Sequence, residues 1–207
     1  MSVAIKTIFW DIGGVLLSNG WGRSQRTRAL TPLGVNLSAY EAVHEEVNFY
    51  WERGLMTAQD FFSKTVLETN PDLNLTFEQI WPRVCSESKV LHQESFDILA
   101  ALKNSGQYRL ATLNNESKEL IAYRPDTFGL RQYFNYFFSS GYVHEMKPLP
   151  DIYRAAIDIS GLPPETALFI DDRQENCEAA RSFGMNAIPF ESPAQLRASL
   201  TQLGIAV

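Results

Sequence analysis

The sequence contains few of the residues from which disulfides and Cys/His metal sites are built. Its 207 residues include two cysteines and three histidines. Cys85 and Cys177 lie far apart and belong to no CxxC or Cys/His pattern. We therefore expect two reduced, structural thiols and no disulfide framework.

The chain also lacks an excess of positive charge and long apolar runs. Its 18 Lys and Arg residues are outnumbered by 24 Asp and Glu residues, which gives a net charge of −6. No Lys/Arg cluster makes a basic face, so we expect neither nucleic acid nor an anionic membrane as a partner. No apolar stretch approaches the roughly 20 residues of a membrane span. Strand-like sequence begins too early for a signal peptide, so we expect a cytoplasmic protein.

Two kinds of sequence follow one another along the chain. Residues 25–93 mix polar and apolar residues at a spacing of three to four, which predicts a small helical bundle. Within it, we expect a helix over 37–54 with Ser38 as its N-cap. Thr57 and Thr76 are expected to begin two more helices, the second kinked or restarted at Pro82.

The rest of the chain alternates strand and helix signals. Apolar strand-like runs cover residues 7–10, 108–115, 136–142, 166–172 and 186–190, with helical patterns between the later ones. This alternation predicts βαβ units in an α/β fold. We expect a doubly wound, Rossmann-like parallel sheet that carries an inserted helical domain.

Polar side chains stand at the ends of three of these predicted strands. They are Asp11, followed by two glycines, then Asn114 and Asn115, and then Asp171 and Asp172. Because the carboxyl ends of parallel strands meet at one edge of a sheet, we expect these groups to form a site. Lys147, just before Pro148, lies between the second and third of these strand ends in the sequence.

The charges in this set indicate the chemistry. Three converging carboxylates repel one another unless a cation lies between them. Mg²⁺ prefers a few carboxylates together with water and a substrate phosphate. Mg²⁺, the Lys147 ammonium and neutral amide donors together suit a phosphoryl group. Asp11 is then placed to attack phosphorus and form an aspartyl-phosphate.

In this order, the four segments resemble the motifs of the haloacid dehalogenase-like (HAD) hydrolases. The matching segments are Asp11 with Gly14-Val15-Leu16, Asn114-Asn115, Lys147-Pro148 and Asp171-Asp172. The resemblance implies a Rossmann-like core over residues 1–17 and 91–207 and a helical C1 cap over residues 18–90. Within the family, the chain is similar to small sugar-phosphate phosphatases and to the phosphatase domain of soluble epoxide hydrolase.

The resemblance also implies a role for each matching residue. Asp11 would be the nucleophile and a Mg²⁺ ligand, with the Gly13 carbonyl and Asp172 as further ligands and Asp171 binding directly or through water. Lys147 would orient Asp11 and neutralise the phosphoryl group. Asn114 and Asn115 would bind phosphate, and Asn176 would brace the acidic loop.

Two positions depart from the family pattern. Gly13 stands where most family phosphatases carry a second Asp as general acid and base, a contribution typically worth about 10²–10⁴-fold. The loss matters least for a good leaving group such as an anomeric phosphate. Glu116, Glu145 and His144 are candidate replacements. Asn114 stands in place of the usual Ser or Thr and still offers an amide donor.

We therefore predict a Mg²⁺-dependent hydrolase of a small phosphorylated metabolite, with a sugar 1-phosphate as first candidate. A metal-free 2-haloacid dehalogenase is an alternative, against which the Asp171-Asp172 pair argues. A catalytically weak, phospho-ligand-binding regulator is the other alternative. We expect a monomer or a homodimer.

The expected cap contains two segments that we predict to contact the substrate and determine specificity. One is the hinge Asn19-Gly20-Trp21, and the other is the turn Glu52-Arg53-Gly54. In that turn, Glu52 would accept hydrogen bonds from sugar hydroxyls, and Arg53 would pair with a second anionic group. An ordinary solvated helix end is the alternative for this turn.

Overall fold

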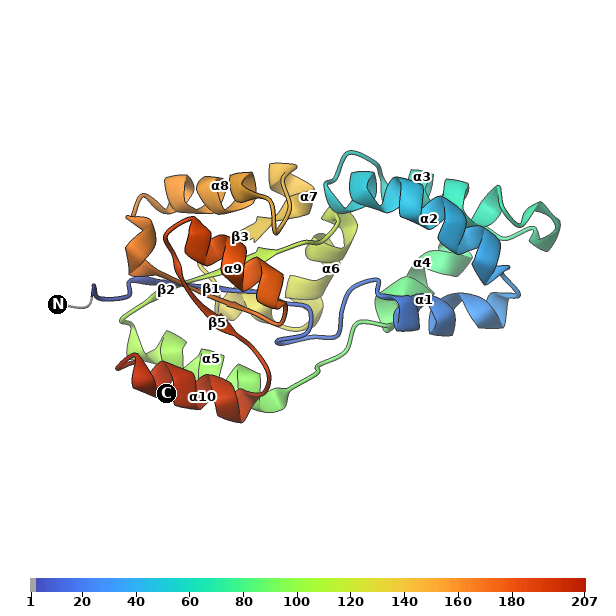
Figure 1. Ribbon diagram of the computed structural model, residues 1–207. Helices are drawn as coiled ribbons and strands as arrows, with labels where there is room; N and C mark the ends of the chain where they lie inside the picture. The colour runs from blue at the N-terminus through green and yellow to red at the C-terminus, as the bar shows by residue number, and fades with distance from the viewer. Residues whose placement is uncertain (1–2) are drawn as a thin grey trace.

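A five-stranded parallel sheet forms the centre of the molecule in the computed structural model, which describes residues 3–207 (Figure 1). The strands are β1 (Thr7–Trp10), β2 (Arg109–Asn114), β3 (Tyr136–Ser139), β4 (Ala167–Asp171) and β5 (Asn186–Pro189). Their order is β3-β2-β1-β4-β5. The direction of winding reverses between β1 and β4, and ligands of open α/β sheets bind at such a point. The predicted doubly wound, Rossmann-like sheet is confirmed.

Helices cover both faces of this sheet. They are α5 (Gln93–Ser105), α6 (Lys118–Thr127), α7 (Ser140–Val143), α8 (Pro150–Ser160), α9 (Gln174–Ser182) and α10 (Pro193–Gln202). Figure 1 shows α5 and α10 below the sheet and α8 and α9 above it. Alternate residues of β1 serve the two faces: Ile8 and Trp10 belong to one core cluster, and Phe9 belongs to the other. Burial on both faces explains why the strands are continuous apolar runs.

The segment between β1 and α5 folds into helices with a core of their own. They are α1 (Arg23–Leu30), α2 (Leu37–Glu52), α3 (Ala58–Phe62), which a π-helical turn (Ser63–Leu67) extends, and α4 (Phe77–Ser86). Trp21, Trp51, Phe61 and Phe62 are buried together in this cluster. We propose residues 18–90 as the cap domain and 1–17 with 91–207 as the core; residues 1 and 2 lie outside the described residues.

Short 3-10 turns complete the described elements, at Thr31–Leu33, Pro71–Leu73, Leu130–Gln132 and Pro164–Thr166. Between residues 3 and 207, the helices are all too short or too polar to cross a membrane. Both cysteines are buried free thiols, as expected.

The cap of α2 differs from the sequence-based expectation. Asn36, and not Ser38, is the N-cap, because its side chain accepts hydrogen bonds from the N–H groups of Ser38 (3.1 Å) and Ala39 (3.2 Å). Asn and Ser are both good N-caps, so their spacing alone did not separate them. Thr57 caps α3 as predicted. The helix that follows Thr76 runs through Pro82 without restarting.

The predicted strand over 136–142 is also shorter in the structure. It ends at Ser139, and the next four residues form the helical turn α7. The Gly141 N–H donates to the carbonyl of Glu116 at 3.0 Å, and the Ser139 hydroxyl donates to the same carbonyl at 2.9 Å. These bonds turn the chain away from the sheet towards the cap.

Cap and core meet at the linkers, at the end of α2 and at Glu119 of α6, which accepts from the Trp51 indole N–H (3.2 Å) and from the Ala58 N–H (2.9 Å). At the linkers, the Ser18 hydroxyl donates to the Glu87 carbonyl (2.8 Å) and accepts from the Lys89 N–H (3.0 Å), which holds the two connections side by side. At the end of α2, Gly54 approaches the backbone of α7 so closely that a Cβ there would lie 2.0 Å from the Gly141 carbonyl oxygen. Only glycine fits this second contact.

Two glycines separate the effect of this contact from that of backbone strain. Gly54 and Gly106 both have φ near 64°, but a Cβ at Gly106 would meet nothing within 4 Å. We expect Gly106→Ala to lower the free energy of unfolding by about 1–2 kcal/mol through left-handed strain. Gly54→Ala should cost at least about 1 kcal/mol more, because the cap must move off α7. Urea unfolding measures both; equal losses would contradict a close cap–core contact.

Candidate active site

Three carboxylates converge at the point where the sheet reverses its winding. Asp11 directly follows β1, Asp171 ends β4 and Asp172 follows it. The Asp11 N–H donates to the Ile170 carbonyl at 2.8 Å and so continues the contact between the two strands. One oxygen from each carboxylate lies within 4.8 Å of the others. Asp11 and Asp171 are buried, and Asp172 is exposed.

The glycine pair after Asp11 makes room for this cluster. Gly14 has φ of +74°, and a Cβ there would lie 2.0 Å from Asp172 Oδ2. Any side chain would therefore be strained and would also push Asp172 away. Gly13 precedes it and lines the cavity in front of the acids.

Lys147 lies between two of the acids. Its Nζ is 2.6 Å from Asp171 Oδ2 and 3.1 Å from Asp11 Oδ1, and the residue is buried. Asn115 holds the Lys147 backbone from both sides: its Nδ2 donates to the Lys147 carbonyl, and its Oδ1 accepts from the Lys147 N–H, each at 2.8 Å. The sequence did not predict this positioning contact. The phosphate contact expected of Asn115 stays a prediction.

Asp171 has more protein partners than the other two acids. Asn176 Nδ2 donates to both of its oxygens, at 2.9 and 3.1 Å, and the Arg173 N–H donates to Oδ1 at 2.8 Å. With Lys147 on Oδ2, these contacts fix the carboxylate within the protein. The expected bracing by Asn176 is present in the structure. Asp11 and Asp172 are left as the acids with room for a further ligand.

Charge in the site is unbalanced without a further cation. Burial raises the pKa of Asp11 to about 7, an increase to which Asp171 and Asp172 add and which Lys147 opposes. Burial alone would lower the pKa of Lys147, but the negative charges of Asp11 and Asp171 outweigh it and raise that pKa. A divalent cation with oxygen ligands fits this set, because it would relieve the repulsion between the acids.

A cavity of about 540 Å³ lies in front of the acids, between core and cap. Its core wall includes Asp11, Asn114, Asn115, Lys147 and Asp172, and its cap wall includes Arg26, Asn48, Trp51 and Glu52. Asn114 ends β2, and its Nδ2 faces Glu116 Oε2 at 3.5 Å. The hinge residues Asn19, Gly20 and Trp21 line the cavity as well.

The three candidates for the general acid that is absent at Gly13 do not lie together. Glu116 lines the cavity, whereas His144 and Glu145 contact Arg53 instead: His144 Nδ1 lies 2.6 Å from the Arg53 carbonyl, and Glu145 Oε1 lies 3.3 Å from Arg53 Nη2. The prediction that Arg53 pairs with a substrate anion is therefore wrong. Its guanidinium is held at the cap–core contact, 4.7 Å over the ring of Phe49.

Glu116 forms a buried ion pair that was not predicted from its spacing along the chain. Its partner, Arg124, is eight residues further on and also donates to the Ser18 carbonyl in the linker. Gly20 packs against the pair, since a Cβ there would lie 2.5 Å from Glu116 Oε1. Burial raises the pKa of Glu116, and Arg124 opposes that increase. The pair joins the hinge to the floor of the cavity.

Comparison with known protein families identifies the family of the chain. A model of the haloacid dehalogenase-like hydrolases matches residues 5–184. The chain belongs to this family of hydrolases. The predicted membership is thus confirmed, together with the fold that it implied.

Among HAD relatives, the chain is 26% identical to drimenol cyclase drtB of Aspergillus calidoustus over 96% of its length, and 24% identical to bifunctional epoxide hydrolase 2 of Mus musculus over 93%. It spans only 36% and 37% of those two proteins. It is also 24% identical to the GMP/IMP nucleotidase YrfG of Escherichia coli, over 89% of the chain and 75% of that protein.

Solved HAD structures share the fold over nearly the whole chain. The HAD enzyme BT-2542 of Bacteroides thetaiotaomicron, in complex with magnesium and inorganic phosphate, has a TM-score of 0.77 at 22% identity, covering 93% of this chain and 99% of that one. L-2-haloacid dehalogenase of Xanthobacter autotrophicus has a TM-score of 0.61 at 21% identity, covering 95% and 83%. At these identities the likeness is one of fold.

The Glu116–Arg124 pair can be tested by unfolding. Arg124→Met should lower the free energy of unfolding by about 3–5 kcal/mol, because the Glu116 carboxylate stays buried without its cation. Adding Glu116→Gln should recover much of that loss. Denaturant unfolding of both single variants and the double variant gives the coupling; losses that simply add would show that the two side chains do not act as a pair.

Proposed function

We propose that the chain is a Mg²⁺-dependent phosphomonoester hydrolase that works through an aspartyl-phosphate on Asp11. The observation that carries the proposal is the contact of Lys147 Nζ with Asp11 (3.1 Å) and Asp171 (2.6 Å), beside Asp172, on one cavity. The similarity to the E. coli nucleotidase and to the enzyme in complex with magnesium and inorganic phosphate supports it.

The residues that would hold Mg²⁺ follow from the family resemblance together with the hydrogen bonds that Asp171 already makes. Asp11, Asp172 and the Gly13 carbonyl would be direct ligands. Asp171 would act through water, because Lys147, Asn176 and a backbone N–H occupy its oxygens. When bound, Mg²⁺ offsets charge on the phosphoryl oxygens and on the acids.

The chain's own groups would then carry out two displacements. An oxygen of Asp11 attacks phosphorus, and the bond from phosphorus to the ester oxygen breaks. Lys147 neutralises the phosphoryl group, and the Asn114 amide donates to it. Water next attacks the phosphorus of the aspartyl-phosphate, which releases inorganic phosphate and restores Asp11.

Proton supply to the leaving group sets the preferred substrate. Gly13 has no side chain, and Glu116 is paired with Arg124. The leaving oxygen therefore departs with little help, so the site suits an ester whose leaving group is already acidic. A small phosphorylated metabolite such as a sugar 1-phosphate is the first candidate.

Phosphate release from p-nitrophenyl phosphate, a hexose 1-phosphate and a hexose 6-phosphate tests the proposal. We expect turnover that needs Mg²⁺, stops with a chelator and favours the first two esters. Asp11→Asn should lower kcat at least about a thousandfold, because the nucleophile is gone. Asp151→Asn, at an exposed acid of α8, is the matched control and should leave turnover unchanged.

Two outcomes would overturn the proposal. An intact aryl ester in the presence of Mg²⁺, together with binding of the phosphoesters, would indicate a phospho-ligand-binding protein. Release of halide from a 2-haloacid without metal would indicate a dehalogenase.

A further inference from the structure

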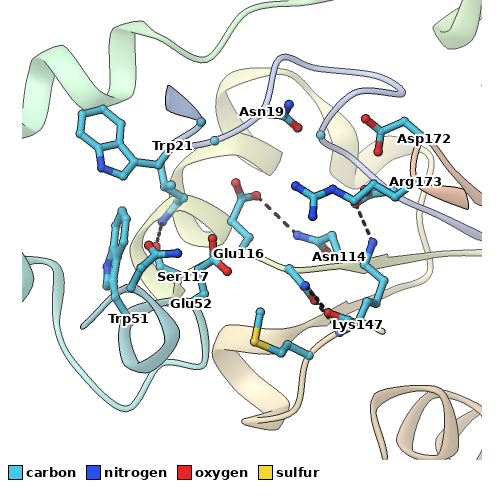
Figure 2. A pocket seen from close by; sticks show the side chains of 18 of the residues that line it. Asn19, Trp21, Trp51, Glu52, Asn114, Glu116, Ser117, Lys147, Asp172 and Arg173 are labelled. Atoms are coloured by element: carbon cyan, nitrogen blue, oxygen red, sulfur yellow. Dashed lines mark hydrogen bonds and ion pairs between the residues drawn. The ribbon is translucent and has the colours of Figure 1, made fainter. Parts of the chain in front are cut away.

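Two polar side chains of the cap face the cavity one helical turn apart. Asn48 and Glu52 lie at the C-terminal end of α2, and both line the cavity. Figure 2 shows Glu52 on the opposite side of the pocket from Asp172, with Glu116 nearby. A phosphoester whose phosphoryl group lies at Asp11 would therefore extend its leaving group towards this pair.

Glu52 is held in place by the core. The Ser140 hydroxyl donates to the Glu52 carbonyl at 2.6 Å. The next residue, Arg53, donates from Nε to the His144 carbonyl at 2.5 Å, and Gly54 lies against Gly141. The end of α2 is thus bound to the segment that leads into Lys147. This contact fixes the position of Glu52 relative to the acids.

This end of the cavity offers hydrogen-bond acceptors that lack donors. Between residues 3 and 207, no Lys or Arg forms an ion pair with Glu52. Burial raises the pKa of its carboxyl group, and the neighbouring Asn48 side chain and the positive charge of Arg173 oppose that increase. Asn48 Oδ1 is buried without a hydrogen-bond partner among the described residues. A buried acceptor of this kind is able to accept a hydrogen bond from a ligand.

The charged groups nearest to Trp21 and Glu116 are paired within the protein. Arg26 donates to both oxygens of Glu41, at 2.8 and 2.7 Å, and to the Trp21 carbonyl. The negative charge of Glu116 is matched by Arg124. Two further arginines line the cavity: Arg23, exposed at the start of α1 and without an ion pair among the described residues, and Arg173, which pairs with the exposed Glu175 at 3.5 Å.

We propose that Glu52 and Asn48 bind hydroxyl groups of the leaving group, so that the site selects phosphomonoesters of neutral polyols and sugars over those of carboxylic acids. The proposal rests on the phosphatase function proposed above. A hydroxyl would donate to the unpartnered acceptors, whereas a substrate carboxylate would be buried opposite a like charge. An ammonium group would also donate, so it forms a separate arm of the test.

The test compares four phosphoesters: p-nitrophenyl phosphate, a hexose 1-phosphate, phosphoglycolate and phosphoethanolamine. Glu52→Gln keeps the size of the side chain and removes its charge. We expect it to raise KM for the hexose 1-phosphate about 10- to 100-fold, the usual effect of losing a hydrogen bond to a charged group. KM for phosphoglycolate should fall, and kcat/KM for the aryl ester should change less than about threefold.

Glu45→Gln, at an exposed position of the same helix, is the matched control and should behave as the unchanged protein. The proposal is overturned if Glu52→Gln leaves the hexose-to-phosphoglycolate ratio unaltered. It is also overturned if phosphoglycolate is preferred and that preference is lost in Arg23→Gln, or if phosphoethanolamine is the preferred ester.

The two proposals fail in different ways. If the unchanged protein hydrolyses the aryl ester, the phosphatase function stands whatever Glu52→Gln does. If it hydrolyses none of the four, that function fails, and calorimetric binding of the same esters tests Glu52 alone. Weaker binding of the hexose 1-phosphate by Glu52→Gln would then support the proposed role of Glu52, and equal binding would contradict that role.

Discussion

The ammonium group of Lys147, held between Asp11 and Asp171, is the interaction on which the site depends. The buried Asp11 and Asp171 lie close to each other and to the exposed Asp172, and the repulsion between these acids is offset by the positive charge of Lys147. The surrounding hydrogen bonds serve that arrangement: Asn115 fixes the Lys147 backbone, and Asn176 fixes the Asp171 carboxylate. The sheet brings the acids together, and this small network sets their spacing.

The cap depends on the same region of the core. One segment, Ser139 to Lys147, makes three contacts in turn. Ser139 bonds to the carbonyl of Glu116, Ser140 bonds to the end of α2, and Lys147 pairs with Asp11. The wall that positions the cap therefore also positions a charged group of the site. The contact with α7 also holds Glu52 in its place opposite the acids.

The sequence was sufficient to predict those features that depend on a single strong physical rule. Buried strands that end in acids predicted the parallel sheet and the cluster of Asp11, Asp171 and Asp172. It was insufficient where the partner of a side chain depends on tertiary packing. Arg53 looked available for a substrate, but a neighbouring turn of the core holds it, and Arg124 finds Glu116 through packing that no spacing rule encodes.

The central claim is that Asp11 takes the phosphoryl group from the substrate. Rapid acid quenching of the enzyme during turnover of p-nitrophenyl phosphate with Mg²⁺, followed by peptide mapping in a mass spectrometer, tests it most directly. With no side chain at Gly13 to activate water, the intermediate should accumulate, and the peptide containing Asp11 should gain the mass of one phosphoryl group. Turnover with Asp11 unmodified and the phosphoryl group on another residue would contradict the account.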